Sequence, residues 1–269
     1  MNALQYIMAF KRSGAGGPIT DGLVLRNQFN DMANLSLDFP ADGSAVFNGT
    51  SDYIETPELN QTLGSVAFWM YRSSVTNSST PYKVPIDVNG GVSEYGIMLG
   101  SWTGSFANEV ISFGAQIPSA WRIAWDTSDS NAIPAGWNHI AITQTGATYS
   151  IYLNGSLKPT TTSGTPVSVT IGSIILGARK DVGGFLGYYD GNLANVAFWN
   201  RALTSDEINS VMWKRYDELA GSESVGLQAW YALDATSVFA DWYTYATNQG
   251  AVIEGRTCVD NALNALAQL

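Results

Sequence analysis

Hydrophobic and polar residues alternate along most of this chain in short runs that are separated by turn residues. Such alternation predicts β-strands, because successive side chains of a strand point to opposite faces of a sheet. The clearest runs are SVAFWMYRS from Ser65, EYGIMLGSW from Glu94, EVISFGAQI from Glu109, WRIAWD from Trp121, WNHIAITQT from Trp137 and SIILGAR from Ser173. Their spacing predicts an all-β fold in which two antiparallel sheets form a sandwich.

Two Asn-Gly pairs mark tight turns within this pattern. Asn48-Gly49 lies inside AVFNGTSDYIETP, and Asn154-Gly155 lies inside TYSIYLNGSLKP. Both residues of such a pair tolerate positive φ, so each segment is predicted to be a strand, a turn and a second strand.

A helix is predicted after the strands. Thr204-Ser205-Asp206-Glu207 fits a capping box, in which the threonine hydroxyl and the Glu207 side chain satisfy free backbone amides. Apolar residues then follow at helical spacing, at Ile208, Val211, Met212, Tyr216 and Leu219. We expect a short amphipathic helix that lies on the sandwich.

Composition supports one large core within the 269 residues, because 45% are hydrophobic and only 13% are charged. We predict three parts: an N-terminal arm and hinge at 1–20, the sandwich at 21–221, and an aromatic C-terminal appendage at 222–269. The arm is apolar before a glycine-rich hinge that ends at Pro18. It is suited either to docking on a partner or to pairing as an edge strand of its own sandwich.

The formal charge of −10 disfavours nucleic acid and anionic membranes as partners. Cys258 is the only cysteine, so it cannot form an intrachain disulfide. The apolar stretch from Ala3 to Phe10 has no preceding positive charge, and no run approaches the roughly 20 apolar residues of a membrane helix. We expect synthesis in a cytoplasm without secretion or membrane insertion.

Four motifs carry a family resemblance: FNGTSDY from Phe47, WNHIA from Trp137, YLNG from Tyr152 and GNLANVAFWNRALT from Gly191. Together they resemble the laminin-G-like jelly roll of the concanavalin A-like lectin and glucanase superfamily. This resemblance implies a jelly-roll sandwich.

The tail also resembles part of this family. GLQAWYALD from Gly226 is similar to the family's first strand, and GLVLRNQFND from Gly22 is a poorer version of it. Two accounts stay open: the tail completes the sandwich as an edge strand, or it is an appendage that mediates contacts. We favour the second, because its many aromatic side chains are unsuited to solvent.

Catalysis finds little support. Glycoside hydrolysis needs two carboxyl groups beside the scissile bond, and the family's glucanases carry them in an E-x-D-x-[x]-E run that this chain lacks. Asp206 and Glu207 are explained by the helix cap. His139 is the only histidine, and the resembling family commonly has a structural histidine there. A nucleophile activated by histidine and a multi-histidine zinc site are both disfavoured, so we expect a protein that is not an enzyme.

Calcium is the one metal that the resemblance implies, and no motif requires any other cofactor. Asn48, Asp52 and Asp190 offer oxygen ligands near the opening strand and the closing signature. The family often has an aspartate at the position of Ala194. The loss of this carboxylate weakens the calcium prediction.

Sugar binding is the common use of the fold and relies on aromatic rings with polar groups beside them. The candidate residues in or near the loops are Tyr82, Trp102, Trp121, Trp125 and Asp126. Trp121 and Trp125 alternate onto one face of their strand, where they would form either a sugar platform or part of the core. The polar stretches from Val75 to Pro85 and from Thr160 to Pro166 are predicted surface loops.

The closing signature, followed by a fresh GLQAWYALD, is similar to jelly-roll domains in structural proteins of tailed bacteriophages. That resemblance implies a non-enzymatic virion component, such as a capsid decoration, fibre or tail appendage protein that touches host glycans. Its expected partners are other virion proteins and copies of itself. The alternative is a carbohydrate-binding lectin module.

Overall fold

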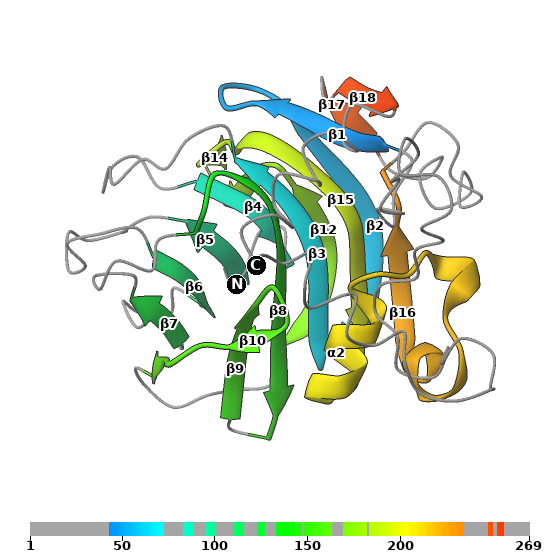
Figure 1. Ribbon diagram of the computed structural model, residues 1–269. Helices are drawn as coiled ribbons and strands as arrows, with labels where there is room; N and C mark the ends of the chain where they lie inside the picture. The colour runs from blue at the N-terminus through cyan, green and yellow to red at the C-terminus, as the bar shows by residue number, and fades with distance from the viewer. Residues whose placement is uncertain are drawn as a thin grey trace, which may run out of the picture. The chain divides into compact units, whose positions relative to one another are not determined.

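The structure is a computed structural model (Figure 1). It describes residues 43–72, 83–88, 95–99, 110–115, 123–126, 133–146, 148–162, 169–181, 183–233, 247–249 and 252–255. The arm and hinge predicted at 1–20 lie outside these ranges. The described residues all belong to one compact unit, Asp38–Leu269.

One sheet, here called sheet A, contains two ten-residue strands, β8 (Gly136–Thr145) and β15 (Asp190–Trp199). Its order is β10 (Ser156–Leu157), β9 (Thr148–Leu153), β8 (Gly136–Thr145), β3 (Ser65–Arg72), β15 (Asp190–Trp199), β1 (Gly43–Asn48) and β18 (Val252–Gly255). A further strand, β16 (Leu227–Tyr231), also pairs with β15. All of these pairs are antiparallel, as predicted.

The second sheet, sheet B, faces the first (Figure 1). Its order is β11 (Thr161–Thr162), β7 (Ile123–Asp126), β6 (Val110–Ala115), β5 (Tyr95–Leu99), β4 (Lys83–Asp87), β12 (Thr170–Leu176), β2 (Tyr53–Thr62) and β17 (Thr247–Gln249). A separate hairpin is formed by β13 (Arg179–Asp181) and β14 (Gly184–Leu186). The predicted all-β sandwich is confirmed.

The core fills the space between the sheets and follows the alternation in the sequence. On β3, Val66, Phe68 and Met70 are fully buried within it, and on β2 Ile54 lies between the half-exposed Tyr53 and Glu55. Burying large apolar side chains contributes about 1.5–3 kcal/mol each. The largest fully buried members of this core are Phe47, Phe68, Phe113, Phe198, Tyr189 and Met70.

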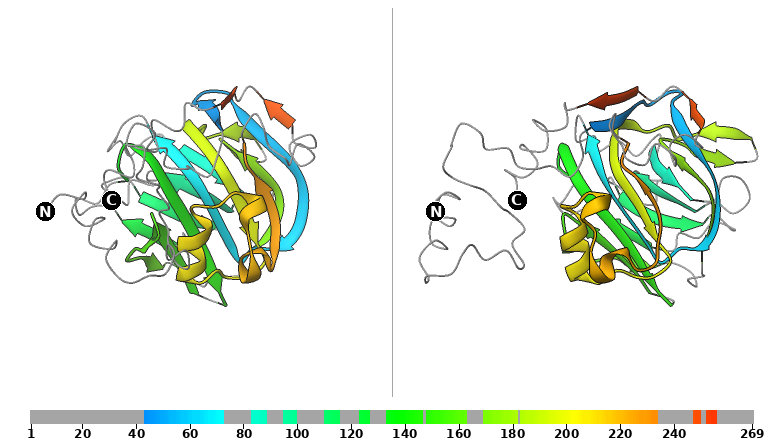
Figure 2. Two further views of the ribbon diagram at one scale, coloured as in Figure 1. Left: turned by 45° about the vertical axis from the view of Figure 1, so that its right-hand side comes forward. Right: turned by 90° about the vertical axis from the view of Figure 1, so that its right-hand side faces the viewer.

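The outer side of sheet A is covered by α2 (Ser205–Val211), as Figure 2 shows. Three alanines, Ala67, Ala141 and Ala197, lie on neighbouring strands and pack with Ile208 and Val211 of the helix. Small side chains at these positions leave room for the helix close to the sheet. Sheet A is therefore buried on both sides at this point.

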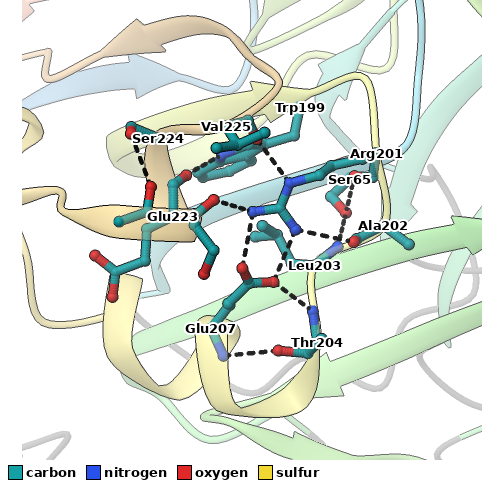
Figure 3. Close-up of polar contacts among 12 residues, drawn as sticks. Ser65, Trp199, Arg201, Ala202, Leu203, Thr204, Glu207, Glu223, Ser224 and Val225 are labelled. Carbon is teal, nitrogen blue, oxygen red and sulfur yellow. Dashed lines mark hydrogen bonds and ion pairs between the residues drawn. The ribbon is translucent and has the colours of Figure 1, made fainter.

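Arg201 fixes the start of α2 to the following loop (Figure 3). Its Nη1 and Nη2 atoms each donate to a different carboxylate oxygen of Glu207 at 2.8 Å. Nε donates to the Val225 carbonyl at 2.7 Å, and the two Nη atoms also donate to the carbonyls of Ala202 and Ser222. The guanidinium joins the helix to the loop that leads into β16.

The side chain of Glu207 also completes the predicted capping box. It accepts from the Thr204 amide at 2.9 Å, while the Thr204 hydroxyl accepts from the Glu207 amide at 3.2 Å. Hydrogen bonds from Arg201 outweigh the effect of burial and lower the pKa of Glu207 from 4.5 to about 2. The Glu207 side chain is therefore ionised at neutral pH and stays ionised in moderately acidic solution.

The described strands of the C-terminal tail belong to the sandwich and follow a short 3-10 helix at Gly221–Ser224. β1 pairs with only the first part of β15, at 190–193, and β16 pairs with the next part, at 196–199. Trp230 and Tyr231 of β16 are buried, and β17 and β18 pair with β2 and β1. For these residues the structure does not show the appendage predicted at 222–269. It agrees with the alternative, in which the tail completes the sandwich, because β16 covers an edge of β15 that β1 is too short to reach.

Several predicted boundaries are also wrong. The helical spacing extends to Leu219, but α2 ends at Val211 because the chain is extended again at Arg215, before a 3-10 turn at Tyr216–Glu218. The predicted loop from Val75 to Pro85 ends earlier, since β4 begins at Lys83, and β11 lies within the predicted loop from Thr160. Within the described part of the chain, no helix has the length and hydropathy needed to cross a membrane.

Candidate functional site

The β1–β2 turn is held by its own side chains. The Asn48 side-chain oxygen accepts from the amides of Thr50 at 2.8 Å and Ser51 at 2.9 Å. Asp52 accepts in return, from the Asn48 amide at 3.1 Å and from the Asn48 side-chain nitrogen at 2.8 Å. These bonds satisfy the polar groups of a turn that passes through Gly49 at φ +73°.

Asp190 and Lys83 lie on either side of Gly49. Asn48 and Asp190 are paired across β1 and β15, and Lys83 Nζ donates to the Gly49 carbonyl at 3.2 Å. A Cβ atom on Gly49 would lie 2.8 Å from Asp190 Cβ and 3.4 Å from Lys83 Nζ. Glycine is required here by both its φ angle and this close approach. The three predicted oxygen residues, Asn48, Asp52 and Asp190, are therefore brought together at one turn.

Next to this turn, the β13–β14 hairpin is attached to the outer side of sheet B. The rings of Tyr53 and Phe185 stack with centroids 3.7 Å apart and an interplanar angle of 19°. Glu55 is two residues from Tyr53 on β2, and Lys180 is paired with Phe185 across the hairpin. Lys180 Nζ lies 2.6 Å from Glu55 Oε1 and 5.6 Å from the Phe185 ring centroid. The Lys180 amide also donates to the buried Asp87 carboxylate at 3.0 Å.

Tyr188 follows the hairpin and lies close enough to Tyr53 to raise the pKa of its hydroxyl, so it brings a third aromatic residue to this region. We call Tyr53, Glu55, Lys180, Phe185 and Tyr188 the hairpin site. Its three aromatic side chains are half-buried, and the side chains of Lys180 and Glu55 are 32% and 28% exposed. Burial, together with the neighbouring Glu55 and Tyr188, raises the pKa of Tyr53, so its hydroxyl remains a donor at neutral pH. The site offers apolar ring surface beside both a donor and an acceptor.

None of the aromatic candidates from the sequence is a member of the hairpin site. Tyr82, Trp102 and Trp121 are outside the described residues. Trp125 and Asp126 belong to β7, where Trp125 is paired with the buried core residue Ile111 and Asp126 with Val110. The ring platform at Trp121 and Trp125 stays a prediction.

Sequence reasoning missed the hairpin site because its members are far apart in the chain. Tyr53 and Glu55 share a face of β2, but Lys180, Phe185 and Tyr188 are more than a hundred residues away and were not singled out. A signal was present, since FLGYYD from Phe185 places three aromatic residues directly before the closing signature.

His139 lies on β8 beneath the end of α2, with its ring centroid 5.4 Å from that of Trp69. It is 2% exposed, and burial lowers its pKa from 6.5 to about 3. It is neutral in the folded protein under ordinary conditions. Burial beneath the helix fits the structural role that the sequence predicted.

The donor set at the turn fits calcium poorly. Calcium takes six to eight oxygen ligands, whereas the oxygens of Asn48 and Asp52 already accept hydrogen bonds within the turn. No group of three or more His, Cys, Asp and Glu side chains suited to a metal occurs among the described residues. Ala194 is buried with Trp69, Trp137 and Met212. It lies where the family often has a carboxylate.

Comparison with known proteins identifies the family. Residues 48–209 match the family model Laminin_G_3, described as the concanavalin A-like lectin/glucanases superfamily. The chain belongs to this superfamily. The matched region includes the whole hairpin site and ends before β16. The strand β16, which pairs with β15 in sheet A, therefore lies outside the matched region. A search of curated proteins finds no match.

Solved structures of other proteins share the fold at low sequence identity. A candidate carbohydrate-binding protein from Bacteroides ovatus ATCC 8483 has a TM-score of 0.56 at 14% identity, over 80% of this chain and 60% of that chain. The heptameric SAP-like pentraxin from Limulus polyphemus has a TM-score of 0.50 at 14% identity, over 81% of this chain and 97% of that chain. This chain therefore spans less than two thirds of the Bacteroides protein and nearly all of the pentraxin.

Proposed function

We propose that this protein is a non-enzymatic carbohydrate-binding module that holds a sugar at the hairpin site. The observation that carries the proposal is the group of three half-exposed aromatic rings beside the Lys180–Glu55 pair, on a lectin-superfamily sandwich. Its position on sheet B matters, because α2 covers the middle of the outer side of sheet A. Ligand access is thus available on the side that the helix leaves open.

The chemistry of the site matches that of a pyranose. One face of a pyranose is lined with C–H groups that pack on aromatic rings, and its edge carries hydroxyls. Tyr188 and the outer ring surfaces of Tyr53 and Phe185 supply the apolar contact. Glu55 accepts and Lys180 donates, and because the two side chains hold each other at 2.6 Å, little rotamer freedom remains to be lost on binding.

The charges favour a neutral sugar over an acidic one. The charge of Lys180 is compensated by Glu55, and the Asp52 and Asp190 carboxylates lie at the adjoining turn. The chain carries −10 overall. A sialic or uronic acid would bring a further negative charge to this surface, where the positive charge of Lys180 is already paired with Glu55.

The state of the carboxyl groups supports a role without catalysis. A general acid in glycoside hydrolysis needs a raised pKa. Glu207 and Glu223 have lowered values: burial raises the pKa of Glu223, but hydrogen bonds from Lys214, Ser210 and the Ala220 amide outweigh it. Both are explained by ion pairs that fix α2 and the loop after it.

As the biological setting we propose a tailed-bacteriophage virion, with the chain acting as a decoration, fibre or tail appendage protein. The support is the resemblance of the closing signature and of GLQAWYALD to phage jelly-roll domains. Light scattering on the whole chain tests the expected self-association. A defined oligomer that becomes monomeric without residues 1–17 supports the virion role, and a monomer in both forms favours a lectin module that acts alone.

A glycan panel tests the sugar-binding proposal. Neutral oligosaccharides should bind saturably, and Tyr188→Ala should weaken binding at least tenfold if the ring supplies about 1.5 kcal/mol. Tyr216→Ala is the matched control, since Tyr216 is 39% exposed near Trp230, away from the hairpin. Loss of binding in Trp125→Ala, with Tyr188→Ala unaffected, would move the site to β7. The absence of binding to every glycan on the panel would refute sugar binding.

A further inference from the structure

We infer that the ammonium group of Lys83 takes the structural place of a cation at the β1–β2 turn, so that this end of the sandwich forms without calcium. Three oxygen-bearing residues meet there, which is the arrangement that points to a metal ion. The hydrogen bonds of each of them indicate that the turn is closed by protein groups alone.

Asn48 has no side-chain oxygen to spare for a metal. Its Oδ1 accepts from the amides of Thr50 and Ser51 at 2.8 and 2.9 Å, and from the Thr50 hydroxyl at 3.0 Å. The Asp52 amide is a fourth, longer donor to this oxygen at 3.4 Å. A carbonyl oxygen has two lone pairs, and these are already shared among the four donors. Coordination of calcium by this atom would break bonds that hold the turn.

Asp52 is committed in the same way. Its Oδ2 accepts from the Asn48 amide at 3.1 Å, and its Oδ1 accepts from Asn48 Nδ2 at 2.8 Å and from the Ser51 hydroxyl at 3.1 Å. Asp52 is only 8% exposed. Both oxygens of the carboxylate therefore accept hydrogen bonds from residues of the turn.

Lys83 supplies the positive charge. Its Nζ donates to the Gly49 carbonyl, a backbone oxygen of the same turn, at 3.2 Å. Lys83 Nζ and Asp190 Cγ both lie within 3.4 Å of the point where a Cβ atom on Gly49 would be. A calcium ion at this turn would be repelled by the ammonium, while the ammonium itself partly balances the charges of Asp52 and Asp190.

The hydrogen bond from the ammonium also ties β4 to the β1–β2 turn, beside the start of β15. Lys83 begins β4 of sheet B, whereas Gly49 follows β1 of sheet A and Asp190 begins β15. The neighbouring Val84 amide donates to the Gly187 carbonyl at 2.8 Å, which fixes the strand that carries the lysine. The lysine therefore links the two sheets at the end where the hairpin site lies.

Two measurements on the unmodified full chain test the inference. Calcium is titrated into the protein in a calorimeter, and the melting temperature is measured in calcium chloride and in EGTA. We expect no binding heat, and the same melting temperature in both solutions. Lys83→Met should lower the melting temperature by about 2–4 °C, because the Gly49 carbonyl loses a charged donor. Lys83→Arg, which keeps the positive charge and a donor, should restore most of it.

Saturable calcium binding by the unmodified protein, or a melting temperature that rises with calcium, would overturn the inference. It would also be overturned if Lys83→Met melted like the unmodified protein. Should Lys83→Met fail to fold, the titration of the unmodified chain still decides the question. None of these readouts requires a sugar ligand, so they are independent of the proposed carbohydrate binding.

Discussion

Replacing Arg201 with methionine should destabilise the protein without disturbing the sheets. Methionine keeps most of the aliphatic volume but removes the guanidinium that joins Glu207 to the carbonyls of Val225 and Ser222. Glu207 would keep its cap to the Thr204 amide but would lose its bidentate partner. The loop that leads into β16 would lose its attachment to the helix.

The lowered pKa of Glu207 gives the magnitude. A carboxyl group whose pKa falls from 4.5 to about 2 on folding stabilises the folded state by about 3 kcal/mol at neutral pH. The sign follows from the direction: the stabilisation is complete above about pH 5 and is lost as the pH falls towards 2. Because the Glu207 side chain is only 11% exposed, little of this value is lost to solvent screening.

Urea unfolding of both proteins near pH 7 and near pH 3 measures this effect. Arg201→Met should lower the free energy of unfolding by about 3 kcal/mol at neutral pH, and by about half as much near pH 3. Ser205→Ala, at an exposed position in the first turn of α2, is the control and should change it by less than about 0.5 kcal/mol. An equal difference at both pH values, or none near pH 7, would refute the reasoning.

Three further predictions concern the tail, the turn and the buried histidine. Deleting residues 226–269 removes β16, with the buried Trp230 and Tyr231, and should abolish cooperative unfolding followed by near-UV circular dichroism; a cooperative transition would mean that the sandwich does not need the tail. Gly49→Ala should destabilise by about 1–3 kcal/mol in urea, and by more than Gly146→Ala, which shares positive φ but meets open space; equal effects would exclude the clash with Asp190. The imidazole signal of His139, the only histidine, should not shift in NMR spectra between about pH 8 and pH 5, because burial lowers its pKa to about 3; a shift centred near pH 6.5 would show that it is exposed.

Local patterns in the sequence were sufficient for the fold. Alternation of apolar residues placed β3 and β8, and the Asn154-Gly155 pair placed the turn between β9 and β10. The capping box from Thr204 to Glu207 placed the start of α2. Each of these signals depends on residues that are close in the chain, so each is readable without knowledge of tertiary contacts.

The tail and the hairpin site depend instead on contacts between distant residues. The burial of Trp230 is explained only by the pairing of β16 with the part of β15 that β1 does not reach. Tyr53 meets Phe185 because the β13–β14 hairpin folds back over sheet B. The sequence pattern around an aromatic residue is the same whether the residue completes a core or lines a site. The burial of Trp230 and the contact between Tyr53 and Phe185 therefore could not be predicted from the sequence.

The central claim is that the hairpin site binds a neutral sugar, and calorimetric titration tests it most directly. The strongest neutral oligosaccharide from the panel is titrated into the unmodified protein and into Tyr188→Ala, after their melting curves show that both are folded. The account predicts saturable binding to the unmodified protein and at least tenfold weaker binding to Tyr188→Ala. Equal affinity for the two proteins, or tighter binding of a sialylated sugar, would contradict it.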